Sequence, residues 1–150
     1  MSKVITAKEA AALVQDGHGI IASGSGGGHA VPERLLEALG TRFRETSSPR
    51  GLTLAHVVGI GDRKTRGAAH LADPALVSRL ITSALIDSPA FIPLALQNLI
   101  ETYTLPQGVL SQMLRDMAAG RPGLITRTGL HTFVDPRQNG GLQGGTQTEP

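Results

Sequence analysis

The sequence predicts an α/β fold in which a mostly parallel sheet is flanked by helices. Short apolar runs typical of buried strands alternate along the chain with segments whose apolar residues recur at helical spacing. The chain has 150 residues, enough for one domain with one hydrophobic core. Hydrophobic residues make up 40% of it but aromatic residues only 3%, so the core must consist of aliphatic side chains. Aliphatic strands are typical of a sheet that is covered by helices.

The first part of the chain alternates helices with strands. Thr6 and Glu9 have the spacing of a capping box and start a short amphipathic helix. Residues 19–22 form a short apolar strand, and Pro32 then opens a helix whose apolar residues share one face. Residues 52–58 are nearly all apolar and lie between two glycines, which predicts a buried strand.

Proline marks the next two helix starts. Asp73-Pro74 predicts a helix that runs through Val77, and residues 80–82 predict a short strand after it. Ser88-Pro89 repeats the same start signal and predicts a helix toward Asn98.

A strand over residues 100–105 comes next and stops at Pro106, because proline lacks a backbone donor and fixes its own φ. Residues 108–119 predict a helix, and residues 124–126 predict one more strand. From residue 136 the composition shifts to Gln, Gly, Thr and Pro. We therefore predict a domain over residues 1–135 and a flexible polar tail over residues 136–150.

Gln107 is the first candidate for a functional residue. It follows Pro106 at a turn from a strand into a helix. The carboxyl ends of strands in an open α/β sheet are where such folds usually bind ligands. A primary amide at that place can donate a hydrogen bond to a developing oxyanion without carrying a charge.

A glycine-rich loop between the first predicted strand and the second helix is the other candidate. Glycine lets main-chain amides approach an anion or an acyl group closely, although a flexible turn is the alternative interpretation. The loop has neither the glycine spacing of a dinucleotide site nor the Gly-Lys-Ser/Thr of a phosphate loop, and it is no nucleophile elbow. We expect substrate contacts from Gly24, Ser25, Gly26, Gly27, Gly28 and His29.

A second polar loop, residues 61–67, carries Arg63, Lys64 and Arg66. It is either solvated surface or a site for an anionic ligand, since arginine and lysine bind phosphates.

The composition excludes several classes of function. The net charge is only +2 and the basic residues are dispersed among acidic ones, so no nucleic-acid partner is expected. There is no cysteine, and the five histidines lack metal-ligand spacing, so no metal site is predicted. No apolar stretch reaches the roughly 18 residues of a membrane span. We expect no membrane partner and a cytoplasmic protein.

Taken together, these segments resemble family I CoA-transferases of the one-chain acyl-CoA:acetate/3-ketoacid, or propionate, type. The resemblance runs from the KVITA start through the glycine loop, PERLLEALGTRF, GIGDRKTRG and AHLADPALVSRLI to LPQGVLSQMLRDMAAGRPGLITRTGLHTFVDPR and the GG after it. The resemblance implies the fold shared by CoA-transferases and ribose-phosphate isomerases, here in shortened form. It also implies a role in short-chain fatty acid or ketone body metabolism.

In that family a glutamate attacks an acyl-CoA thioester and then carries CoA as a glutamyl thioester to a carboxylic acid. The resemblance implies that Gln107 of the LPQG motif helps to form the oxyanion hole and that Gly108 and the glycine loop line the substrate site. Acyl-CoA and a carboxylic acid would be the substrates, with coenzyme A as a substrate and no other cofactor. A homo-oligomer is also implied.

The sequence departs from the family in two respects. Ser25 stands where the glycine signature usually has a bulky aromatic residue, and the spacing to Pro32 is one residue longer. The family's nucleophilic glutamate lies in a later part that has no match here, so we expect a second CoA-transferase half as partner and no activity from the chain alone. The alternatives are a non-catalytic metabolite- or partner-binding module and an anion-binding domain that uses the loop with Arg63 and Arg66.

Overall fold

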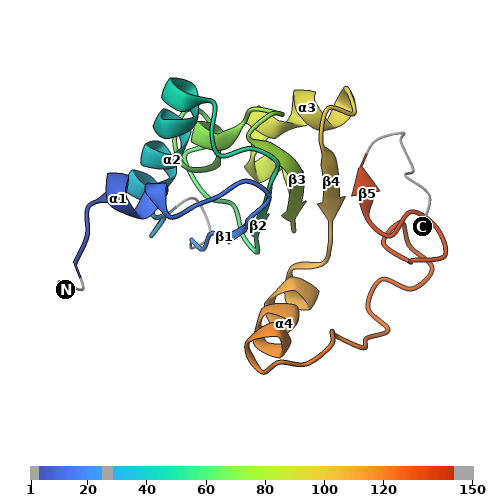
Figure 1. The fold of residues 1–150 in the computed structure, drawn as a ribbon. Helices are drawn as coiled ribbons and strands as arrows, with labels where there is room; N and C mark the ends of the chain where they lie inside the picture. Colours follow the sequence, from blue (N-terminus) through green and yellow to red (C-terminus); the bar gives the residue numbers. More distant parts are fainter. Residues whose placement is uncertain (1–3, 25–28, 144–150) are drawn as a thin grey trace.

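A five-stranded sheet forms the centre of the computed structural model, which describes residues 4–24 and 29–143 (Figure 1). The strands follow chain order across the sheet; the first four are parallel, and the last is antiparallel to its neighbour. Their bounds are β1 (Gly19–Ile21), β2 (Leu52–His56), β3 (Val77–Thr82), β4 (Glu101–Thr104) and β5 (Leu142–Gln143). The predicted α/β class with a mostly parallel sheet flanked by helices is confirmed.

The helices of the described residues are α1 (Ala7–Ala12), α2 (Glu33–Thr46), α3 (Ile92–Leu96) and α4 (Gln107–Ala118), with 3-10 turns at Gly67–Leu71, Leu85–Asp87 and Pro89–Phe91. The predicted capping box starts α1, because the Glu9 N–H donates to Thr6 Oγ1 at 3.2 Å and the Thr6 N–H donates to Glu9 Oε2 at 2.7 Å. As predicted, α2 follows Pro32, and a helical segment follows Ser88-Pro89.

The connections before β4 pack on one face of the sheet, where they bury the core. Crossovers between parallel strands are almost always right-handed, so strands added in one direction place their connections on the same side. In the core, Leu36 of α2, Leu71 of the first 3-10 turn and Phe91 of the third join Leu54 and Leu80 of the sheet. Figure 1 shows α1 and α2 close together and α3 near the amino end of β4, while α4 lies apart, past the carboxyl end of β4.

The predicted helix from Asp73-Pro74 through Val77 is wrong. Asp73 does cap a single turn, since its Oδ1 accepts the Ala75 N–H at 2.8 Å and its carbonyl accepts the Val77 N–H at 2.9 Å. The chain then enters β3 at Val77, because Val77 and Leu80 are fully buried and pair with β2. The predicted strand over residues 80–82 is the end of this longer strand.

The structure also differs from the prediction near the end of the chain. Residues 124–126 form no strand, and Ile125 is fully exposed with no neighbouring strand to pair with. The edge of β4 is instead occupied by β5, which lies within the segment predicted to be a polar tail. Residues 136–143 therefore have defined structure, and residues 144–150 lie outside the described part of the chain.

Candidate functional site

The parallel strands end at one edge of the sheet, and the candidate segments follow them there. Residues 22–24 follow β1, residues 57–61 follow β2, Ser83 follows β3, and residues 105–107 follow β4. Because ligands in open α/β folds bind outside the carboxyl ends of the strands, this edge is the candidate site.

Gln107 is the first residue of α4 and is exposed at this edge. Pro106 occupies the N-cap position with φ −55° and ψ 133°, so the chain turns from strand to helix where the sequence predicts. The Leu105 N–H donates to the Thr82 carbonyl at 3.0 Å, which ties the turn to β3. The Gln107 side chain is exposed and forms no hydrogen bond with the described residues. Gly108 is exposed beside it.

The glycine loop is described only at its two ends. Gly24 is half-buried, and a Cβ atom built on it would lie 3.2 Å from Ile60 Cγ2, so this end packs on the segment after β2. His29 is exposed. Ser25, Gly26, Gly27 and Gly28 lie outside the described residues, so their predicted substrate contacts stay a prediction.

A groove of about 340 Å³ lies directly beside the Pro106 turn. Its walls come from two parts of the chain, the ends of β3 and β4 and a turn near residue 130. They consist of Ser83, Thr104, Leu105, Pro106, Gly129, Thr132, Phe133 and Val134. Residues 129–134 were not among the predicted site residues. A hydrophobic Phe-Val pair directly before Asp-Pro-Arg was the signal that could have indicated them.

Asp135 holds this turn in place. It is buried, and its carboxylate accepts the His131 N–H at 2.8 Å and the Arg137 N–H at 3.1 Å. The Arg137 side chain, followed by the backbone N–H groups of His131 and Arg137, keeps the pKa of Asp135 well below its usual range. The anionic form therefore fixes the groove wall to the segment that leads into β5.

The basic loop, residues 61–67, is also held in a defined conformation, because carboxylates of this chain accept hydrogen bonds from it. Hydrogen bonds from the backbone N–H groups of Arg66, Lys64 and Thr65 lower the pKa of Asp62 to about 2. At the base of the loop, Gly61 (φ 118°) and Gly67 (φ 66°) adopt conformations that favour glycine.

The two arginines of this loop are paired with neighbouring carboxylates. Arg63 forms an ion pair with Asp87, and Arg66 forms one with Glu33, which also accepts the Gly67 N–H at 2.7 Å. These pairs favour a structural interpretation of the loop over an anion site.

The histidines do not form a cluster. His56 is buried at the end of β2 with Nδ1 2.9 Å from the Val58 carbonyl, so Nδ1 carries the proton and Nε2 accepts the Ser88 hydroxyl at 3.2 Å. Burial lowers the pKa of His56. Within residues 4–24 and 29–143, no three potential ligands lie close enough to hold a metal ion. In the same ranges, no helix has the length and apolarity needed to cross a bilayer.

Comparison with known proteins assigns the family. Residues 4–148 match the family model for coenzyme A transferase. The chain is 41% identical over 138 residues to the acetate CoA-transferase YdiF of Escherichia coli K12 and 38% identical over 149 residues to the caffeate CoA-transferase of Acetobacterium woodii. These matches cover 92% and 99% of this chain but 26% and 28% of the relatives.

A solved structure agrees with this assignment. The acyl-CoA transferase YdiF of E. coli O157:H7, solved as a thioester complex with CoA, superposes with a TM-score of 0.91 at 39% identity. The match covers 97% of this chain and 30% of that one. The chain thus spans between a quarter and a third of the length of these relatives. It belongs to the coenzyme A transferase family.

Proposed function

We propose that the chain supplies the oxyanion-stabilising and acyl-binding part of a CoA-transferase, which moves CoA between a short-chain acyl-CoA and a carboxylic acid. The observation that carries the proposal is the position of Gln107. In a chain of this family, Gln107 follows the carboxyl end of β4 and comes directly after Pro106, which lines an open groove.

In the proposed reaction, a glutamate carboxylate attacks the thioester carbonyl, and the electron pair of the C=O moves onto oxygen. Collapse of that oxyanion breaks the C–S bond and leaves an acyl-glutamyl anhydride and CoA thiolate. The thiolate then attacks the glutamyl carbonyl, which releases the first acid and leaves a glutamyl-CoA thioester. An acceptor carboxylate repeats these steps in reverse. Gln107 donates its amide N–H to each oxyanion.

We propose that the nucleophilic glutamate comes from outside this chain. Among the described residues, Glu33 and Glu101 are held in ion pairs with Arg66 and Arg79, and Glu9 belongs to the capping box of α1. Glu37 and Glu45 lie along α2, away from the groove. The related YdiF structure solved as a thioester complex with CoA supports a covalent route of this kind.

The groove beside Pro106 is proposed to take the acyl end of the substrate. Small-molecule sites are mostly apolar with a few placed polar groups, and this groove combines Leu105, Phe133 and Val134 with the hydroxyl groups of Ser83 and Thr132. The nearby Gln107 amide would then face the thioester carbonyl.

Reconstitution tests the proposal. The purified chain is mixed with the remainder of E. coli YdiF that lies outside the matched quarter, and CoA transfer from acetyl-CoA to propionate is followed. We expect turnover from the mixture and from neither part alone. Multiple turnovers by the chain alone would contradict the assignment of the nucleophile. An assembled but inactive mixture, with metabolite binding by the chain measured by calorimetry, would support a non-catalytic binding module instead.

A further inference from the structure

Within residues 4–24 and 29–143, helices pack closely on one face of the sheet only. Parallel sheets in α/β proteins are normally covered on both faces. Here the connections between β1 and β4 share one face, and α4 is the one described helix that spans part of the other.

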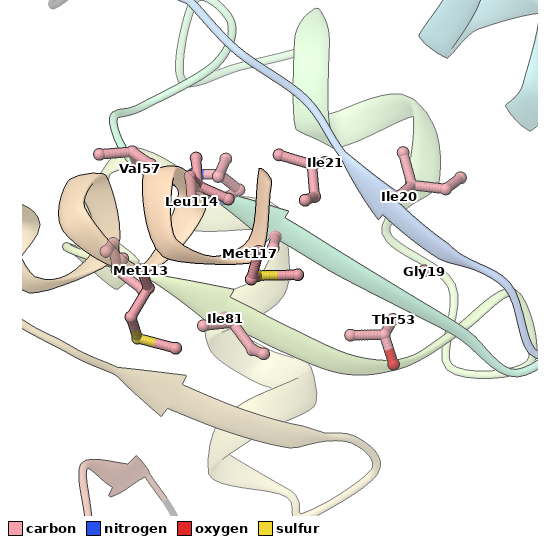
Figure 2. Close-up of a pocket in the computed structure, with 12 residues that line it drawn as sticks. Gly19, Ile20, Ile21, Thr53, Val57, Ile81, Met113, Leu114 and Met117 are labelled. Carbon is pink, nitrogen blue, oxygen red and sulfur yellow. The ribbon is translucent and has the colours of Figure 1, made fainter. Parts of the chain in front are cut away.

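This second face, which we call the open face, is defined by Ile21, Ala55 and Ile81 on the strands and by Met113, Leu114 and Met117 on α4. Register places the three strand residues side by side, because Ile21 pairs with Ala55 and Ala55 with Ile81. Figure 2 shows Met113, Leu114 and Met117 of α4 in the same region as Ile21 and Ile81.

The open face is apolar and incompletely packed. A cavity of about 270 Å³ separates α4 from the strands, and it is walled almost entirely by aliphatic side chains. Ile21 is 53% exposed and Met117 is 59% exposed. Contiguous exposed apolar surface is typical of interaction sites.

The chemistry of the face favours a polypeptide over a nucleotide ligand. Phosphates of CoA would need free cations, but no lysine or arginine is among the residues that line this cavity. Arg79, on the same side of the strands, is bonded to Glu101 with Nε and Oε2 2.5 Å apart. The relatives are in total more than three times as long as the part that matches this chain, so they contain further polypeptide that could cover a second face.

We propose that the open face is the docking surface for the remainder of a CoA-transferase polypeptide, which inserts an apolar element between α4 and β1 to β3. This inference rests on the proposed function because it takes the occupant from the same enzyme. It adds which surface of the chain joins the two parts.

Single cysteines test this directly, because the chain has no cysteine of its own. Ile21→Cys and Met117→Cys report on the open face, and Ile125→Cys, at a fully exposed position in the segment after α4, is the control. Maleimide labelling of each site is measured by peptide mass spectrometry with and without the remainder of YdiF. We expect at least a tenfold slower rate at positions 21 and 117, and a rate within twofold at position 125.

The outcomes separate this inference from the proposed function. Unchanged labelling at positions 21 and 117 overturns the docking surface, even if CoA transfer is restored. Protection without CoA transfer keeps the docking surface and removes the proposed function. Protection that appears with increasing concentration of the chain alone assigns the face to a second copy and overturns the inference. If the two parts do not associate when mixed, the same labelling on a single fused polypeptide decides between protection and exposure.

Discussion

The side chain of Arg137 donates hydrogen bonds to both carboxylate oxygens of Asp135, with Nε 3.0 Å from Oδ1 and Nη2 2.6 Å from Oδ2. The same carboxylate accepts the His131 N–H, and the Asp135 carbonyl accepts the Gln138 and Gly140 N–H groups. One residue thereby links the wall of the groove to the approach to β5.

Asp135→Asn should loosen this segment, because a neutral amide cannot replace a buried carboxylate that receives a charged guanidinium. We expect trypsin to cleave after Arg127 and Arg137 several-fold faster than in the parent chain. Glu37→Gln, at an exposed position on α2, is the control. Equal cleavage rates in Asp135→Asn and the parent chain would contradict the linking role.

The pKa of Asp62 gives a second prediction. Its folded value of about 2 lies below the unfolded value of about 3.9, so its hydrogen bonds contribute stability above pH 4. That contribution is lost as the pH falls from about 4 toward 2. A carboxyl carbon NMR titration should give a midpoint near 2 for Asp62. A midpoint close to 4 would mean that the loop N–H groups do not hold the carboxylate.

His56 gives a trend in the same direction but at higher pH. Burial lowers its pKa in the folded chain, so protonation is easier in the unfolded chain and stability falls as the pH drops below about 6.5. His56→Leu should remove this dependence but cost about 1–3 kcal/mol at pH 8, because Ser88 and the Val58 carbonyl lose a buried partner. Urea unfolding at several pH values measures both effects. His29→Gln, at an exposed position, should keep the parent's pH dependence.

The same substitution at two glycines should change stability in opposite directions. A Cβ atom on Gly40 of α2 would lie 2.2 Å from the His70 carbonyl oxygen, so Gly40→Ala should destabilise the chain by about 1–3 kcal/mol. A Cβ atom on Gly108 of α4 would have no atom from outside its own helix within 4 Å, so Gly108→Ala should stabilise the chain by about 0.5–1 kcal/mol. Urea unfolding provides the measurement. Equal effects at both sites would contradict the close packing of α2 on the turn beneath it.

The sequence predicted the elements whose signals are local. Thr6, Pro32 and Pro106 each mark a helix start through backbone chemistry that acts within one turn, and the structure places helices after all three. Asp73-Pro74 gives the same signal and also caps a turn, but pairing of Val77 with β2 ends it. That pairing depends on residues 25 positions away, which a local pattern does not contain.

The residues of the candidate site also differ in whether a local sequence signal reveals them. Gln107 could be located because proline fixes the turn before it. The wall at Phe133 and Val134 could not, because it becomes part of the site only when Asp135 folds residues 129–141 back against β4. The short strand β5 has two residues and carries no periodicity, so composition alone predicted a polar tail there.

Gln107 provides the sharpest functional prediction. In the reconstituted enzyme, Gln107→Ala should lower kcat roughly a hundredfold, the usual effect of losing one oxyanion donor. KM should change little, since the hydrogen bond strengthens only as negative charge develops on oxygen. Gln112→Ala is the matched control, because it removes an exposed amide from the same helix five residues further on. Cysteine labelling of the open face should be the same in both variants, which separates loss of chemistry from loss of assembly. An unchanged kcat in Gln107→Ala would remove this residue from the oxyanion hole, whereas a selective rise in KM would make it a substrate-binding residue instead.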